Sequence, residues 1–202
     1  MNIWGFIATA IVLTIMPGPD ILFVLTQSIS RGKKAGMVFA AGLCTGLIFH
    51  IAALSLGLSV LIKESPDTFI LLKVFGAAYL VFLGIKSFLG RNKASFRLNY
   101  EKIDSRKLYT KGILMNLLNP KVILFFLAFF PQFIDINSPN TAIQICFLGF
   151  LFIIQAFIIF STVAILADKL SEKIMQKPRM PYIMNIIESV LFVAIGISLL
   201  FT

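Results

Sequence analysis

Charged residues are scarce in this sequence. Asp, Glu, Lys and Arg make up 13% of its 202 residues, while hydrophobic residues make up 58%. Soluble domains carry about 25% charged and about 45–50% apolar residues. Because so few charged residues cannot cover the surface of a soluble globule of this size, lipid must solvate much of that surface. The composition therefore predicts an integral membrane protein.

Histidine and cysteine are also rare, with one His and two Cys in the whole chain. Cys44 and Cys146 show neither metal-ligand nor disulfide-scaffold spacing. The metalloprotease motif His-Glu-x-x-His and the hydrolase motif Gly-x-Ser-x-Gly are absent, so we expect no metal, no cofactor and no enzymatic activity. Because no Lys or Arg precedes Arg31, the first apolar stretch lacks the basic region of a signal peptide and is interpreted as a retained helix.

Long apolar stretches, by contrast, are abundant. A helix that spans the membrane needs about 20 mostly apolar residues, and six windows reach this length. They are residues 3–28, 37–62, 67–89, 111–134, 140–167 and 182–201. The sequence therefore predicts an all-α, polytopic protein with six transmembrane helices in a lipid bilayer.

Basic residues concentrate in alternate loops. Fourteen of the 18 Lys and Arg residues lie in or beside the first, third and fifth loops, whereas the second loop has only Lys63 and the fourth has none. Cytoplasmic loops carry such an excess, so we expect the odd loops in the cytoplasm and both termini outside. This placement explains the net charge of +9 without a nucleic-acid partner.

The two halves of the chain resemble each other weakly. Residues 19–23 in the first window align with residues 120–124 in the fourth, each beginning with proline. Because each half holds three spans, an odd number, the second half must be inverted in the membrane, as in many secondary transporters. The predicted parts are a first three-helix repeat at residues 1–90, a basic cytoplasmic linker at 91–110 and a second three-helix repeat at 111–202.

Proline motifs interrupt the first and fourth windows. Proline lacks an N–H and clashes with the preceding turn, so Pro17-Gly18-Pro19-Asp20 must break or kink its helix. Asn119-Pro120-Lys121 has the same effect, with Asn119 suited to cap a new helix and Pro120 to begin it. Kinks that only serve packing are the alternative interpretation, but each break also carries a charge.

Asp20 and Lys121 lie at similar depths in their windows. A charge this far inside the bilayer costs at least about 2.5–3.5 kcal/mol, so opposite charges at matching depth indicate an ion pair or a shared site. A purely structural salt bridge is the alternative. In a shared site, Lys121 and the N-terminal ends of both half-helices would hold an anionic group, and Asp20 an ammonium or a proton. Both signs in one site favour a small zwitterionic solute, such as an amino acid.

Further polar side chains lie within the predicted spans. His50 follows Gly42 and Gly46 at four-residue steps, a spacing that lets helices approach closely, so His50 should face the bundle as a packed residue or a proton relay. Lys73 can reach the membrane surface with its long stem, whereas a short acid such as Glu188 cannot. The candidate site residues outside the proline motifs are His50, Lys73, Tyr79 and Glu188, and Gln155 is a further candidate for a cavity lining.

Four motifs together carry a family resemblance. They are Pro17-Gly18-Pro19-Asp20, Gly42-x-x-x-Gly46, the segment from Lys73 to Gly84 and Asn116-Leu117-Leu118-Asn119-Pro120-Lys121. In order and over essentially the whole chain, they resemble the LysE/RhtB family of bacterial amino-acid exporters. The resemblance implies a protein of the bacterial cytoplasmic (inner) membrane that exports amino acids or close derivatives, such as homoserine or threonine, driven by the proton gradient. It adds Asn116 to the candidate site residues, while Glu188 departs from the small residue, commonly glycine, that the family pattern leads us to expect.

Two other classes of function stand beside export. A membrane thiol–disulfide electron carrier needs two thiols at one site, whereas Cys44 and Cys146 fall in different windows, away from both proline motifs. A non-transporting membrane scaffold has no need for charges at Asp20 and Lys121. A homodimer is compatible with the sequence, and no motif specifies the solute or the coupling ion.

Overall fold

The computed structural model describes residues 2–64, 66–93, 104–135, 138–170 and 180–200, which form helices and no strands. The elements are α1 (Ile3–Ile15), α2 (Pro19–Arg31), α3 (Lys33–Glu64), α4 (Pro66–Gly90), η1 (Arg91–Lys93), α5 (Ser105–Leu117), α6 (Pro120–Leu124), η2 (Phe125–Phe129), η3 (Phe130–Phe133), α7 (Thr141–Lys169) and α9 (Met180–Leu200). The predicted all-α class is confirmed for this part of the chain.

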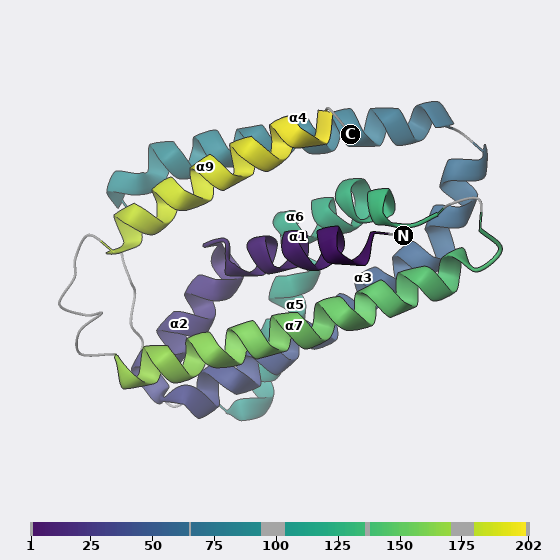
Figure 1. Ribbon diagram of the computed structural model, residues 1–202. Coiled ribbons are helices and arrows are strands. Elements are labelled where there is room, and N and C mark those ends of the chain that lie inside the picture. Colours follow the sequence, from purple (N-terminus) through teal and green to yellow (C-terminus); the bar gives the residue numbers. More distant parts are fainter. Residues whose placement is uncertain (1, 65, 94–103, 136–137, 171–179, 201–202) are drawn as a thin grey trace.

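The helices form two groups with the broken helices between them (Figure 1). α4 and α9 pack along each other on one side, and α3 packs against α5 and α7 on the other. α1 and α6, which adjoin the proline motifs, lie between the α4–α9 pair and the α3–α5–α7 group. Side chains at the two breaks are therefore enclosed from both sides.

Both predicted breaks are present. α1 and α2 meet at an angle of 54°, and the helices on either side of Asn119 meet at 46°. Pro19 begins α2 and Pro120 begins α6, the positions at which the missing N–H of proline costs no helical hydrogen bond. After α6 the chain passes through a π-helical turn, η2, and a 3₁₀ turn, η3, so the fourth window is not one straight helix.

The described residues contain fewer complete spans than the sequence predicts. Two helical stretches, Lys33–Leu56 and Thr141–Lys169, are long and apolar enough to cross a membrane alone, and counting each bent pair as one span raises the number to four. The described apolar parts of α4 and α9 are shorter than a span; they are Val74–Gly90 and Asn185–Ile197. Six spans and an inverted repeat therefore stay predictions.

Glycines bring α3 and α5 into direct backbone contact. A Cβ added to Gly112 would lie 2.5 Å from the carbonyl oxygen of Phe39 and 3.0 Å from the Cα of Gly42, and a Cβ at Gly46 would lie 2.7 Å from the Cβ of Asn116. The close approach predicted from Gly42 and Gly46 is confirmed. It places Asn116 against α3, next to the second break.

The outer surface is rich in large apolar side chains. Trp4 is 82% exposed, Leu56 is 80% exposed and Phe75 is 66% exposed. Inside, Phe6 and Phe130 have no exposed surface, and their ring centroids lie 5.1 Å apart in an edge-to-face arrangement. Aromatic rings thus fill the interior, while the exposed apolar surface suits lipid rather than water.

Candidate functional site

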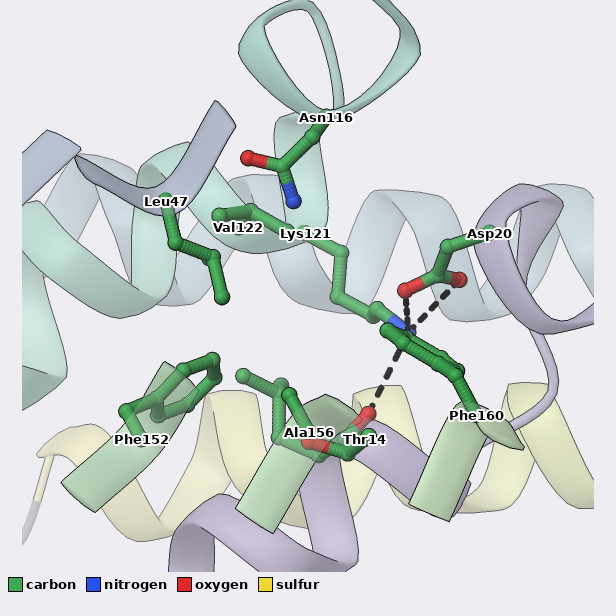
Figure 2. A pocket seen from close by; sticks show the side chains of 10 residues that line it. Thr14, Asp20, Leu47, Asn116, Lys121, Val122, Phe152, Ala156 and Phe160 are labelled. Atoms are coloured by element: carbon green, nitrogen blue, oxygen red, sulfur yellow. Dashed lines mark hydrogen bonds and ion pairs between the residues drawn. The ribbon is translucent and has the colours of Figure 1, made fainter. Parts of the chain in front are cut away.

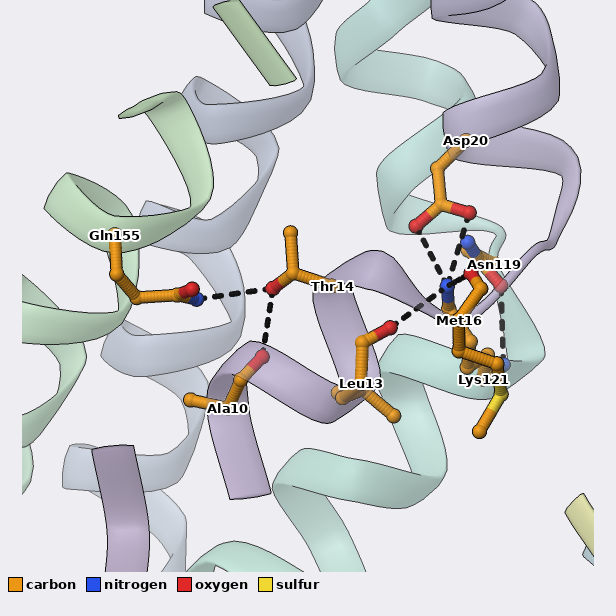
Figure 3. A network of polar contacts seen from close by, with 8 residues as sticks. All are labelled: Ala10, Leu13, Thr14, Met16, Asp20, Asn119, Lys121 and Gln155. Atoms are coloured by element: carbon orange, nitrogen blue, oxygen red, sulfur yellow. Dashed lines mark hydrogen bonds and ion pairs between the residues drawn. The ribbon is translucent and has the colours of Figure 1, made fainter. Parts of the chain in front are cut away.

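The first break leaves two backbone carbonyls without helical partners. The carbonyl of Leu13 would normally accept a hydrogen bond from the N–H four residues later, but Pro17 has no N–H. Because α1 ends at Ile15, the carbonyl of Met16 also has no N–H partner within the helix. The Nζ of Lys121 replaces both donors, at 3.2 Å from the Leu13 oxygen and 3.3 Å from the Met16 oxygen (Figure 3). Lys121 therefore caps the broken end of α1.

The second break positions Lys121 for this role. The side-chain oxygen of Asn119 accepts a hydrogen bond of 3.0 Å from the backbone N–H of Lys121, so Asn119 caps α6 as predicted. Lys121 then lies in the first turn of α6, and its side chain crosses to the junction of α1 and α2. The residues of the two proline motifs thus meet at one place.

Asp20 and Lys121 form a buried ion pair. The Lys121 Nζ lies 3.0 Å from Oδ1 and 2.9 Å from Oδ2 of Asp20, and the two residues are 2% and 3% exposed. Removing one partner of such a pair costs about 3–5 kcal/mol, because the other charge is left buried and alone. The pairing expected from their matching depth is present.

In this conformation Lys121 has no hydrogen-bond donor left for a solute. An ammonium has three N–H donors, and Leu13, Met16 and Asp20 take all three. The two helix N-termini also differ, because Asn119 caps α6 whereas Gly18, the N-cap residue of α2, provides no side-chain cap. The N-terminus of α6 is therefore capped by a side chain, whereas that of α2 is not, and the expected anion site at the half-helices stays a prediction.

Three ionisable side chains converge on Gly18. A Cβ added to Gly18 would lie 3.0 Å from the Asp20 Oδ1, 3.2 Å from the Lys121 Nζ and 3.5 Å from the Oε1 of Glu188. The absence of a side chain at Gly18 lets these groups approach. Glu188 reaches this place from α9, and the hydroxyl of Ser87 on α4 lies 2.7 Å from its Oε2.

A small cavity adjoins the ion pair, with four polar residues in a mainly apolar lining (Figure 2). Its lining includes Thr14, Asp20, Asn116 and Lys121, and the space open to the centre of a water molecule is about 10 Å³, room for a single water. Within the described residues, the buried oxygen Oδ1 of Asn116 has no hydrogen-bond partner. A residue that lines the cavity thus keeps an unused acceptor, and its oxygen lies against Gly46 of α3.

A second polar contact lies farther along α1. The side-chain nitrogen of Gln155 donates to the Thr14 hydroxyl at 2.9 Å, and Thr14 donates to the Ala10 carbonyl (Figure 3). The Oε1 of Gln155 is buried without a partner in the described part of the chain. Gln155 thus reaches a residue that lines the cavity beside the ion pair.

A second cavity on the other side of Lys121 is almost entirely apolar. It has the same open space of about 10 Å³. Its lining comes from α1, α4, α6, η2 and α9, and consists of Thr9, Leu13, Leu80, Lys121, Leu124, Phe125, Phe129, Phe192 and Ile195. The Lys121 side chain therefore lines both cavities.

Two of the remaining candidate residues, His50 and Tyr79, are not among the residues that contact the ion pair or line its cavities. The ring of His50 faces the bundle as expected, stacked on Phe126 and 3.3 Å from the backbone oxygen of Asn116, but it lines neither cavity. Tyr79 is 42% exposed and packs on Phe82, away from the pair. Lys73 belongs to α4, and its side chain lies outside the described part of the structure.

Sequence reasoning missed Ser87 and the two carbonyls that Lys121 caps. The signal for the carbonyls was present, because Pro17 must leave the Leu13 oxygen without a donor. Ser87 had no local signal, since its contact with Glu188 depends on how α4 packs on α9. Cys44 is buried on α3 and Cys146 is exposed on α7, and both are free thiols, an arrangement that gives a thiol–disulfide carrier no paired site.

Broken apolar helices around a buried ion pair, with a lipid-compatible outer surface, define a multi-pass membrane protein with a polar interior site. Comparison with known proteins places the chain in a family. The family model for the LysE type translocator matches residues 11–202, and this chain belongs to that family. It is therefore a translocator and not an enzyme.

Two relatives illustrate the family. The chain is 32% identical to the leucine efflux protein of Salmonella typhimurium over 171 residues, covering 78% of this chain and 81% of that protein. It is also 32% identical to the uncharacterized membrane protein YrhP of Bacillus subtilis, covering 98% of this chain and 97% of that protein. No solved structure gives a significant match.

Proposed function

We propose that this chain is a secondary active exporter that moves amino acids with apolar side chains across the bacterial cytoplasmic membrane in exchange for protons. The observation that carries the proposal is the Asp20–Lys121 pair, buried between two broken helices and beside an apolar cavity. The similarity to a leucine efflux protein supports the apolar class of solute.

The pair provides one group of each sign for a zwitterion. When the pair opens, the solute carboxylate takes the place of Asp20 on Lys121, and the solute ammonium takes the place of Lys121 on Asp20. Each buried charge exchanges one partner for another, so none is left uncompensated in the membrane interior. Asn116 lines the cavity beside the pair, and α2, whose N-terminus has no side-chain cap, begins one residue before Asp20.

The apolar cavity suits the solute side chain. Leu80 from α4 and Phe192 from α9 face Lys121 across it, so a carboxylate on Lys121 directs the side chain toward them. A charged side chain would lose its hydration there without gaining a partner. Since each cavity now has room for one water, the α4–α9 pair must move away from α1 and α6 to admit a solute.

The predicted six spans and inverted repeat are part of this proposal. The α4–α9 and α3–α7 pairs each join equivalent helices of the two halves, and the packing of α5 on α3 has its counterpart in the packing of α1 on α7. This supports repeats at residues 1–90 and 111–202 with the basic linker between them. A homodimer is compatible with this arrangement.

The proposed orientation predicts where a reporter will be found. A reporter fused after Lys107 should behave as cytoplasmic, because the basic residues of the odd loops stay inside. Paired fusions of alkaline phosphatase and a cytoplasmic fluorescent protein make the measurement. A periplasmic signal at this position would reverse the orientation of both termini.

The solute is tested by the amino acids that cells release. Cells that overexpress the chain and are fed dipeptides should release leucine and similar apolar amino acids several-fold faster than cells without it, with little change for lysine or aspartate. Phe192→Ala enlarges the apolar cavity and should shift the ratio of phenylalanine to leucine export upward by about tenfold. The measurement is extracellular amino-acid analysis over time.

Val190→Ala is the matched control for this experiment, because Val190 lies on the same helix but is 61% exposed. Its solute preference should equal that of the wild type. Equal release of charged and apolar amino acids, or an unchanged preference in Phe192→Ala, would show that the apolar cavity does not bind the side chain of the solute.

A further inference from the structure

The hydroxyl of Ser87 lies between two acceptors. Its Oγ is 2.7 Å from the Glu188 Oε2 and 3.0 Å from the backbone oxygen of Asn185. A hydroxyl has one proton to donate. If Glu188 were ionised, both neighbours would be acceptors and one short contact would have no hydrogen between its oxygens.

A protonated Glu188 satisfies both contacts. Its O–H donates to the Ser87 Oγ, and the Ser87 O–H donates to the Asn185 oxygen. Each oxygen then has a suitable partner, and the chain of bonds runs from α9 to α4 and back to α9. The observed distances fit O–H···O hydrogen bonds in both steps.

The neighbouring charges favour the same state. Among the described residues, the charged groups that face Glu188 are Lys121 from α6 and Asp20 from α2, while α4 contributes the neutral Ser87. Lys121 already directs its three N–H groups elsewhere. An ionised Glu188 would therefore add a net negative charge to a neutral pair inside the bilayer, which is costly.

We propose that Glu188 is protonated in this conformation and carries the proton that is exchanged for the solute. The proposal rests on the proposed function for its solute. Asp20 then binds the ammonium of the solute, so the exchanged proton and the solute ammonium are carried by two different carboxyl groups.

Because Lys121 can pair with only one carboxylate at a time, protonation of Glu188 and binding of the solute by Asp20 exclude each other. When the proton leaves Glu188 for water, the new carboxylate attracts Lys121, which needs only to pass the bare backbone of Gly18. Asp20 then exchanges Lys121 for the ammonium of the solute, while Lys121, drawn toward Glu188, holds the carboxylate of the solute. When Glu188 regains a proton, Lys121 returns to Asp20 and the site closes without solute, as in the present structure.

The protonation state is tested first, by infrared spectroscopy of the purified protein in lipid. The wild type at neutral pH should show the carbonyl band of a protonated carboxylic acid, and Glu188→Gln should lack it. Asp168→Asn, which changes an acid in the last turn of α7, should keep the band and is the matched control. The same band in Glu188→Gln and in wild type would overturn the proposal.

The exchange of proton and solute is tested next, by leucine exchange in proteoliposomes between pH 5.5 and 8.5. The apparent affinity of the wild type should rise with pH, because deprotonation of Glu188 frees Asp20. In Glu188→Gln the affinity should stay low and vary less than twofold over the range. A variant with the pH dependence of the wild type would overturn the proposal.

Ser87→Ala tests which way the hydrogen bond between Ser87 and Glu188 runs. The protonated acid loses its hydrogen-bond acceptor, so the pH profile of leucine exchange should move to lower pH. If Ser87 instead donated to an ionised Glu188, the profile would move to higher pH and the proposal would be wrong. Ser55→Ala on α3, a serine whose hydroxyl donates to the Ala52 carbonyl of its own helix, is the control and should leave the profile unchanged.

The two proposals fail in different ways. Wild-type protein that exchanges no amino acid would refute the proposed function and the coupling role of Glu188, while an infrared band that disappears in Glu188→Gln would still establish the proton on this residue. Rapid leucine exchange by a wild type that lacks the band would refute the proton on Glu188 and leave the proposed function standing.

Discussion

Asp20→Asn should reduce leucine export to the background of cells without the protein, while the protein still reaches the membrane. Asparagine has a similar size but cannot balance Lys121 or hold an ammonium. A buried pair that loses one partner is destabilised by about 3–5 kcal/mol, so some loss of stability should accompany the loss of export. The measurement is the rate of export of preloaded leucine at matched amounts of membrane protein.

Asp168→Asn is the control for this variant. Asp168 lies in the last turn of α7, away from the ion pair, and its loss should leave export near the wild-type rate. Wild-type export from Asp20→Asn would contradict a role for Asp20 in transport.

A double variant separates a structural ion pair from a transport site. Replacing a buried pair by neutral residues of similar volume is often neutral or stabilising, so Asp20→Asn combined with Lys121→Met should recover most of the stability lost in the single variant. Export should stay absent, because neither end of the zwitterion finds a charge. Thermal unfolding in detergent and leucine export are measured on the same protein. Recovery of both would show that the pair only holds α2 against α6.

The sequence predicts the breaks and the ion pair because their causes are local. Pro17 and Pro120 cannot donate backbone hydrogen bonds wherever the helices pack, and an isolated charge at the depth of Asp20 or Lys121 is costly in any fold. Two such charges of opposite sign must therefore pair with each other or with a solute. The prediction needed only the chemistry of proline and the low polarity of the bilayer.

What the sequence could not predict depends on packing between distant helices. The contact between Ser87 and Glu188 needs α4 and α9 to lie side by side, and the closeness of Glu188 to Lys121 needs Gly18 between them. The exposure of Tyr79 likewise follows from which face of α4 meets α9. None of these contacts has a signature in the local sequence.

The start of α5 was predictable in principle. The polar stretch before Lys111 was interpreted as part of a linker, but the helix begins at Ser105, where Asp104 caps it by accepting from the backbone N–H of Arg106. An aspartate followed by good helix formers is an N-cap signal. The helix extends beyond the apolar window toward its N-terminus.

Gly112→Val should prevent the accumulation of folded protein, because α3 and α5 touch backbone to backbone at this residue. Even one added carbon would lie 2.5 Å from the Phe39 oxygen and 3.0 Å from the Cα of Gly42, distances at which the helices must separate. Overpacking a tight interior costs about 1–3 kcal/mol and occasionally more. A branched side chain between two backbones belongs at the upper end, and the separation also displaces Asn116 from the site. The measurement is the yield of monodisperse protein after detergent extraction, together with its melting temperature.

Gly90→Ala provides the matched comparison, since a Cβ there would meet its nearest atom, the side-chain nitrogen of Asn185, only at 3.9 Å. This variant should give wild-type yield and melting temperature. Gly112→Ala should fall between the two, because its single methyl group requires a smaller separation than valine does. If Gly112→Val were as stable as Gly90→Ala, the close contact of α3 and α5 would be wrong. The position of Asn116 beside the ion pair would then lose its support as well.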